Sequence, residues 1–275
     1  MALGEGVSRF AVGDRLNSHL YSRWIGGMPA HDELGYCFGS PLPGGLAEFM
    51  IIHEDSAVRA PDDVSDEDAS TLPIAALTAW YSLVDFDRIE AGQTLPVQGT
   101  GGVPIFAAQI DLALDAKVII TSSRGENLEA VIKLGAVAGV NYRKTPDWAA
   151  EVLKLTDGKG VDLLLEVAGG GGVNDSVQAT KVGGRIAQIG FLTGQTAALN
   201  LMPMIFRQTT IRGIAVAPRT AFDRMNEFLN PSHPSRDRSC VPVCTKRVRL
   251  TSTWLAVHSA RCWLRRSSTA AVLLD

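Results

Sequence analysis

The sequence predicts an α/β protein with a doubly wound parallel sheet and a smaller β-domain. A glycine-rich turn at 98–103 separates a strand pattern from a helix pattern. A second β-rich run, Lys117–Thr121, follows one helix later, as a βαβ unit requires. Val161–Val167 is an almost continuous apolar run, which is typical of a strand covered on both faces.

The region before residue 70 differs from the rest. Gly and Pro turns alternate there with short apolar stretches, and the alternation in Phe49–His53 predicts β-structure. Ser65–Asp68 supplies a capping box and an acidic first turn, which predicts a helix over about Ala69–Val84. We interpret the acidic run as a capped helix start rather than a metal site.

Six strands alternate with helices over the middle of the chain. The predicted strands are Thr94–Gln98, Lys117–Thr121, Val137–Asn141, Val161–Val167, Gly184–Gly190 and Ile211–Val216. The predicted helices are Gly102–Leu114, Glu126–Leu134, Pro146–Leu155 and Val173–Thr180. Pro96 is awkward in a central strand because it removes a ladder donor.

The turn Gln98–Val103 is the main functional signal. Gly99 and Gly101 stand where bare backbone would approach a pyrophosphate, and the helix amides that follow would face its charge. Glycines alone are also compatible with a plain tight turn. The strand before and the βαβ spacing after the turn favour a dinucleotide site.

Composition is that of a globular protein, with 46% hydrophobic and 20% charged residues. No apolar stretch reaches the roughly 20 residues that span a bilayer, so no membrane partner is predicted. The start of the chain lacks the pattern of a secretion signal. Four cysteines without paired spacing argue against a disulfide framework and favour a reducing, cytoplasmic setting.

The character of the sequence changes near residue 230. Residues 1–230 contain all 27 glycines and carry a net charge of −9, whereas 231–275 contain none and carry +6. Three of the four cysteines also fall in this tail. We interpret 231–275 as a poorly ordered basic tail from out-of-frame or mis-spliced translation. A nucleic-acid-binding arm is the disfavoured alternative.

Several stretches, taken in order, resemble the medium-chain dehydrogenase/reductase superfamily, near its zinc-independent quinone-oxidoreductase-like members. The carrying stretches are Val12–Arg15, Gly45–Phe49, Leu72–Trp80, Gln98–Val103, Lys133–Ala136, Asn141–Arg143, Gly160–Asp162 and Gly183–Ile186. The resemblance implies a partial GroES-like catalytic domain over 1–72, a Rossmann NAD(P)-binding domain over 73–218 and a returning helix over 219–230. It also implies hydride transfer at the cleft between the domains. Relative to the family, the chain is expected to lack the opening strands and the normal ending.

Cofactor choice follows from charge at the end of the second strand. An NAD-specific fold places Asp or Glu about 20 residues beyond the glycine turn. This chain has Ser122, Ser123 and Arg124 there, which favours the 2′-phosphate of NADP(H) over NAD(H). The resemblance places Tyr142 beside that phosphate and finds Asn127 where a lysine is expected. Loop and helix-cap chemistry is the alternative role of the serines.

The resemblance implies further cofactor contacts. It places Thr78 near the nicotinamide, although a helix threonine can simply bond to its own backbone. Ala168, Gly169, Gly190 and Phe191 follow strands at the ligand-binding edge, although Gly169–Gly172 is also compatible with a flexible loop. With Thr78 and Tyr142, the predicted cofactor-binding set comprises Gly99, Thr100, Gly101, Gly102, Val103, Ser122, Ser123, Arg124, Ala168, Gly169, Gly190 and Phe191.

On the substrate side, the resemblance points to Tyr21 and Trp24, and no general acid is assigned. His31 and Cys37 lie close in sequence without the third ligand that zinc requires, so no metal is predicted. We interpret His19, His31 and His53 as surface or packing residues.

The leading hypothesis is an NADP(H)-dependent oxidoreductase acting on a quinone, enone, aldehyde or alcohol. Its partners would be a small-molecule substrate and, by resemblance, a second copy in a homodimer. A truncated or frameshifted remnant that at most binds nucleotide is the alternative. A nucleic-acid-binding arm on a metabolic domain is the third hypothesis.

Overall fold

A computed structural model describes residues 2–230 of the chain. These residues form two compact units, one made of 2–77 with 216–230 and the other of Thr78–Ala215. The basic tail predicted over 231–275 lies outside the described residues. Within the described part, no helix is long and apolar enough to cross a membrane.

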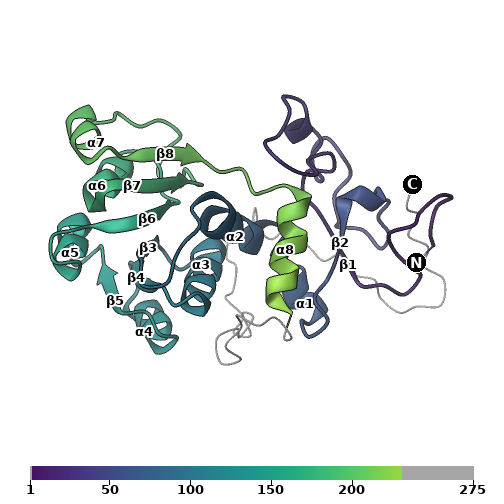
Figure 1. Cartoon of the computed structure of the whole chain (residues 1–275), viewed down its shortest axis with the longest axis horizontal. Helices are drawn as coiled ribbons and strands as arrows, with labels where there is room; N and C mark the ends of the chain where they lie inside the picture. Colours follow the sequence, from purple (N-terminus) through teal and green to yellow (C-terminus); the bar gives the residue numbers. More distant parts are fainter. Residues whose placement is uncertain (1, 231–275) are drawn as a thin grey trace. The chain divides into compact units, whose positions relative to one another are not determined.

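The second unit is a six-stranded parallel sheet with helices between the strands (Figure 1). Its strands are β3 (Thr94–Gln98), β4 (Lys117–Ser122), β5 (Ala138–Asn141), β6 (Val161–Glu166), β7 (Thr180–Gln188) and β8 (Thr210–Gly213). Its helices are α3 (Gly102–Ala113), α4 (Gly125–Lys133), α5 (Trp148–Leu155), α6 (Gly172–Ala179) and α7 (Leu201–Arg207). The six predicted strands and their parallel arrangement are confirmed.

The order of the strands is β5-β4-β3-β6-β7-β8. The chain therefore starts in the middle, fills one half of the sheet and then crosses back to fill the other. This is the doubly wound order that binds dinucleotides where the winding reverses, here between β3 and β6. Pro96 does lie in the central strand: it is in register with Ile119 of β4, while the ladder to β6 contains only Val97 and Leu165.

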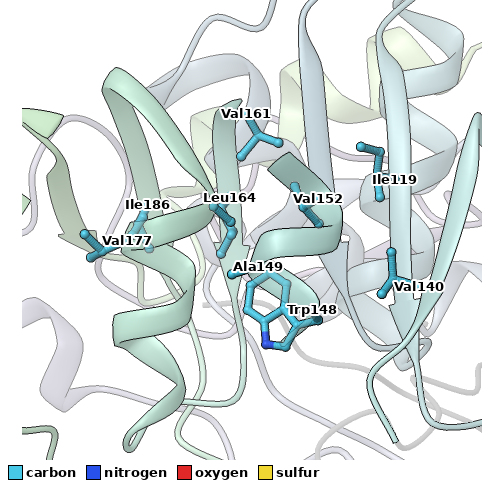
Figure 2. Packing of buried hydrophobic residues seen from close by; sticks show 10 residues of the cluster. Ile119, Val140, Trp148, Ala149, Val152, Val161, Leu164, Val177 and Ile186 are labelled. Atoms are coloured by element: carbon cyan, nitrogen blue, oxygen red, sulfur yellow. The ribbon is translucent and has the colours of Figure 1, made fainter. Parts of the chain in front are cut away.

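One face of the sheet is covered by α5 and α6. Figure 2 shows Trp148, Ala149 and Val152 of α5 packed against apolar side chains of the strands. The strand residues are Ile119, Val140, Val161, Leu164 and Ile186. In Figure 1, α3 lies on the opposite side of the sheet from α5 and α6. Cover on both faces explains the apolar run of β6, in which Leu163, Leu164 and Leu165 have no exposed surface.

The first unit contains an antiparallel pair, β1 (Leu16–Ser18) and β2 (Ala57–Arg59). A small core of Phe10, Ile52 and Ala57 lies next to this pair. The helix α8 (Arg219–Leu229) returns to the same unit, and the Asn226 side chain donates to the Arg59 carbonyl oxygen at 2.7 Å. Ser65 caps α1 (Asp66–Ala69) by accepting from the Asp68 amide at 3.1 Å, as the sequence predicts.

Two predictions for this part of the chain were wrong. Phe49–His53 forms no strand. Its alternation is real, because Met50 and Ile52 pack inward, yet no neighbouring strand pairs with its backbone. The single helix over Ala69–Val84 is instead α1, followed by π-helical turns at Leu72–Ala76 and Tyr81–Phe86 on either side of α2 (Leu77–Trp80). Pro73 lacks the amide that a continuous α-helix would need there.

Element boundaries in the second unit shift by a few residues. The largest change is at β7, which begins at Thr180 rather than Gly184. At β8, the strand ends at Gly213 rather than Val216, whose φ of +60° is not that of a strand. The helix α7 was not predicted in the sequence.

Candidate cofactor site

The glycine turn lies between the end of β3 and the start of α3, as predicted. Gly99 has a φ of +80°, a conformation that favours glycine, and its amide donates to the Thr121 carbonyl oxygen at 2.8 Å. A Cβ added at Gly99 or Gly101 would meet no atom within 4 Å. Space in front of the turn is therefore open. The first amides of α3 have no acceptor within their own helix, so the turn can receive an anion.

The Thr100 hydroxyl of this turn accepts a hydrogen bond from Asn127 Nδ2 of α4 at 2.7 Å. Asn127 stands where the family resemblance leads to a lysine. In this chain the Asn127 side chain therefore connects the glycine turn to α4, whereas a lysine would place a positive charge there.

The end of β4 carries hydroxyls and a cation but no carboxylate. Ser122 is buried, and its Oγ accepts from the Arg124 amide at 3.2 Å, so it shapes the loop. The Ser123 carbonyl oxygen accepts from Asn141 Nδ2 at 3.3 Å, which ties this loop to the residue before Tyr142. The Arg124 side chain is exposed and Tyr142 is half exposed. These two side chains are accessible to a ligand at this end of the sheet.

The loops that follow β6 and β7 are joined to each other. The Gly170 amide donates to the Gly194 carbonyl oxygen at 3.0 Å, and the Thr193 amide donates to Ala168 at 2.7 Å. A Cβ on Gly169 would lie 2.7 Å from the Gly194 oxygen, and one on Gly190 would lie 2.3 Å from the Val167 oxygen. Gly169 and Gly190 are thus required for close backbone packing. The sequence predicted them as cofactor contacts, with a flexible loop as the alternative for Gly169, and did not indicate this packing role.

A pocket of about 610 Å³ opens among these loops. Its walls include Gly169, Gly190 and Phe191 of the predicted set. Further lining residues, which the sequence did not single out, are Gln188, Gln195, Thr196, Leu199, Ile211 and Ile214. None of the described residues that line it is charged. The pocket can therefore receive an uncharged, largely apolar group.

The remaining predicted contacts have separate surroundings. Thr78 of α2 is buried, and its carbonyl oxygen accepts from the Ser82 hydroxyl at 2.8 Å. In the first unit, Trp24 is buried and its indole N–H donates to the Gly27 carbonyl oxygen at 3.0 Å. The ring of Tyr21, which is half buried, lies 6.0 Å from that of Trp24. Burial raises the pKa of the Tyr21 phenol.

The three histidines of the first unit have different environments. His31 and His53 are exposed, whereas His19 is fully buried. Its two ring nitrogens lie 2.7 Å from the carbonyl oxygens of Tyr21 and Ala217. Burial lowers the pKa of His19, against the opposing effect of the two carbonyls. Among the described residues, no three His, Cys, Asp or Glu side chains gather so that they could hold a metal ion.

The polar residues behind the site were not predicted. Glu166 at the end of β6 is fully buried and bonds to Gln98 and Ser176. The sequence did contain a signal for such a residue. Glu166 interrupts an otherwise apolar strand, and a carboxylate that is buried there requires hydrogen-bond partners. Its partners could not be identified, because Gln98 lies 68 residues away in the chain.

Comparison with known proteins identifies the family. Residues 102–230 match the zinc-binding dehydrogenase family. A zinc-type alcohol dehydrogenase-like protein of Schizosaccharomyces pombe is 35% identical over 244 residues, which cover 86% of this chain and 70% of that protein. The chain belongs to the medium-chain dehydrogenase/reductase superfamily. It is an oxidoreductase of this superfamily, and the resemblance to the superfamily inferred from the sequence is confirmed.

Solved structures of the superfamily share the fold of this medium-chain dehydrogenase/reductase. An alcohol dehydrogenase from Sinorhizobium meliloti is 36% identical with a TM-score of 0.75, over 82% of this chain and 67% of that one. A quinone oxidoreductase from Thermus thermophilus, solved also with NADPH, is 26% identical with a TM-score of 0.53, over 64% and 57% of the two chains.

A more distant relative in sequence is the L-threonine 3-dehydrogenase of Deinococcus deserti. It is 27% identical over 231 residues, which cover 78% of this chain and 63% of that enzyme. The relatives therefore differ in the substrates that their names give, and the substrate of this chain has to be argued from its own residues.

Proposed function

We propose that this medium-chain dehydrogenase/reductase binds NADP(H) and transfers a hydride between the nicotinamide and a quinone, enone, aldehyde or alcohol. The observation that carries the proposal is the open glycine turn at the start of α3, at the reversal point of a doubly wound sheet. The backbone from Gly99 to Val103 would hold the pyrophosphate against the helix amides.

The choice of NADP(H) depends on the end of β4. Arg124 and the Ser123 hydroxyl would bind the 2′-phosphate, with Tyr142 beside it, and no Asp or Glu stands in this loop to repel it. Because Ser122 already accepts from the Arg124 amide, we assign it to shaping the loop. The Thr100–Asn127 hydrogen bond would hold the glycine turn beside this loop.

The other end of the cofactor would lie against the loops after β6 and β7. Ala168, Gly169, Gly190 and Phe191 would form the nicotinamide wall, with Thr78 proposed nearby. The bound nicotinamide supplies the hydride chemistry, while the protein orients the reactants and excludes water. The uncharged lining of the pocket favours an uncharged substrate over a carboxylate or a phosphate.

We also propose that the reaction needs no zinc. The described residues offer no group of three potential ligands, whereas a catalytic zinc takes three from the protein. Metal analysis of the purified protein, together with activity after prolonged dialysis against EDTA, tests this. Stoichiometric zinc, or an activity that EDTA removes and zinc restores, would contradict it.

Titration by nicotinamide fluorescence tests the cofactor assignment. We expect NADPH to bind at least about ten-fold more tightly than NADH, as charge-assisted hydrogen bonds to a phosphate allow. Arg124→Gln should remove most of that preference. Lys133→Gln takes the same charge from an exposed position at the other end of α4 and should leave the preference unchanged. Equal binding of the two cofactors by the native protein would refute the NADP(H) assignment.

Turnover is tested by NADPH oxidation against a panel of quinones, enones and aldehydes, with a carboxylate-bearing analogue of each. We expect the neutral member of a pair to react faster. If NADPH binds but no neutral compound is reduced, the hydride-transfer proposal fails while the cofactor assignment stands.

We propose further that two copies pair through β8. This strand is an edge of the sheet, and an edge presents unpaired backbone groups that a second copy can satisfy by two-fold symmetry. Beside it, α7 exposes Leu201, Met202, Ile205 and Phe206, each more than half exposed. Such an apolar surface next to an unpaired edge favours a symmetric partner.

A further inference from the structure

The carboxylate of Glu166 is a four-way junction at the end of β6. Its Oε1 accepts from the backbone amides of Ala168 at 2.7 Å and Gly169 at 2.9 Å. Its Oε2 accepts from Gln98 Nε2 at 3.0 Å and from the Ser176 hydroxyl. The side chain has no exposed surface. A buried carboxylate with four donors is held in a single geometry, because each lost donor would leave charge uncompensated.

The junction connects parts of the site that are far apart in sequence. Gln98 is the last residue of β3 and immediately precedes Gly99 of the open turn. Its Oε1 also accepts from the Val167 amide at 3.3 Å. On the other side, Thr193 donates to the carbonyl oxygens of Ala168 and Gly169, at 2.7 Å from its amide and 3.0 Å from its hydroxyl. Hydrogen bonds therefore run from the end of β3 to the loop after β7.

A role confined to strand packing would not require this arrangement. Two successive amides, those of Ala168 and Gly169, turn inward onto one oxygen, and this fixes the path of the loop before α6 begins at Gly172. Gly169 has a φ of +69°, a left-handed conformation that is only one of several open to a glycine in a flexible loop. The carboxylate provides the acceptors that hold it there.

We infer that Glu166 is a positioning residue for hydride transfer: it holds the loop Ala168–Gly169 in place relative to the glycine turn. The inference rests on the proposed function for what these two segments bind. It does not place Glu166 in contact with substrate or cofactor. The reach of the side chain matters in this role, because the carboxylate must span from β6 to both amides.

Two substitutions separate reach from charge. Glu166→Asp keeps the carboxylate but shortens the side chain by one methylene, so it should lose the loop amides. Glu166→Gln keeps the length and one oxygen for both loop amides but loses the charge. Its Nε2 would meet the donating Nε2 of Gln98, so Gln98 must turn its side-chain amide and accept from it through Oε1. Positioning predicts that aspartate is the damaging change and glutamine the mild one. A purely electrostatic role predicts the reverse. Glu129→Gln, at an exposed site on α4, is the control.

The first measurement is amide hydrogen exchange of the cofactor-free protein. In Glu166→Asp, exchange at Ala168 and Gly169 should rise by about ten-fold or more, as loss of a local hydrogen-bonded structure allows. In Glu166→Gln it should stay within about three-fold of the native rate. This result decides whether Glu166 fixes the loop, even if the native protein binds no NADPH and the proposed function fails.

The second measurement compares steady-state kinetics with binding of 2′-phospho-ADP-ribose, which keeps the 2′-phosphate of NADPH and lacks the nicotinamide. Glu166→Asp should lower kcat by about ten-fold or more while the dissociation constant of 2′-phospho-ADP-ribose changes by less than about three-fold, since positioning affects the reacting end. Native kcat in Glu166→Asp, or equal damage in both variants, would overturn the inference.

If Glu166→Asp does not fold, Gln98→Leu provides a second route. It cuts the link to β3 and leaves both loop amides on the carboxylate. Protection at Ala168 and Gly169 should then persist, while the dissociation constant for NADPH rises by about ten-fold because the turn after Gln98 loses its anchor. An unchanged dissociation constant would overturn the proposed connection.

Discussion

Glycine has two different functions in this site, and single substitutions can separate them. Gly101 has an ordinary backbone conformation and faces open space, so a side chain there disturbs the ligand alone. Gly190 faces the Val167 backbone at 2.3 Å, so a side chain there disturbs the fold.

We therefore expect Gly101→Val to unfold like the native protein but to lose NADPH binding, because the isopropyl group occupies the path of the pyrophosphate. Gly190→Ala should instead lower the free energy of unfolding by about 2 kcal/mol or more, since the backbone around it must shift. Fluorescence titration and urea unfolding measure the two effects. Native affinity in Gly101→Val would exclude the placement of the pyrophosphate.

Asp111 of α3 is a buried carboxylate without compensation. It has no exposed surface, and neither oxygen has a hydrogen-bond partner among the described residues. Burial raises its pKa well above the ordinary value of 3.8, and the charge of Asp87 raises it further. Burial also raises the pKa of Asp87 to about 6, against the opposing effect of Arg185, with which it forms an ion pair.

The sign of the pH effect follows from these shifts. Above pH 4 the unfolded chain loses its Asp111 proton while the folded chain retains it, so the free energy of unfolding falls as pH rises. Asp111→Ala removes this penalty and suits a helix. We expect it to raise the free energy of unfolding by about 1–3 kcal/mol at pH 7, with a smaller gain near pH 4.5.

Urea unfolding at the two pH values checks this prediction, with Glu129→Ala as a control for loss of an exposed carboxylate. A destabilised Asp111→Ala protein, or a gain that does not depend on pH, would contradict the prediction.

Among the elements, β8 and α7 form the edge through which we propose pairing. Phe206→Glu places a charge on the apolar surface of α7, where Phe206 is 71% exposed. We expect the protein to change from dimer to monomer, since burying an unpaired charge opposes association. Sedimentation velocity measures the mass. Leu155→Glu makes the same type of change on α5 and should leave the dimer intact. A native protein that is monomeric at all concentrations would contradict the proposal.

The strands of the sheet were predictable because each is an apolar run bounded by turn residues, and β3 was predicted to the residue. The helix α7 was missed because its apolar residues are exposed, so it lacks the pattern of a packed helix. Phe49–His53 had the pattern of a strand without a partner strand. A sequence pattern predicts burial, whereas pairing also depends on which neighbour is present.

The candidate site shows the same difference. The glycine turn and the end of β4 are local in sequence, so their residue types indicated a nucleotide site. The Glu166 junction joins segments as far as 78 residues apart, such as Gln98 with Ser176, and the pocket is lined by residues from 169 to 215. No single stretch of sequence indicates these contacts, because the residues come together only when the sheet has formed.

At the scale of the molecule, cofactor binding should stabilise the fold by mass action. At 100 times its dissociation constant, NADPH should add about 2.7 kcal/mol to the free energy of unfolding. Thermal unfolding should therefore shift upward more with NADPH than with NADH at equal concentration, and not at all in Gly101→Val. An equal shift with both cofactors would argue against a 2′-phosphate site.

The first unit is discontinuous in sequence, and this has a consequence during synthesis. All six strands of the sheet have left the ribosome before α8, which belongs to the unit that the chain begins with and whose Ala221, Phe222 and Met225 are almost completely buried. The unit that is begun first is therefore completed last. Residues 2–77 remain without α8 while the second unit, Thr78–Ala215, is already able to fold.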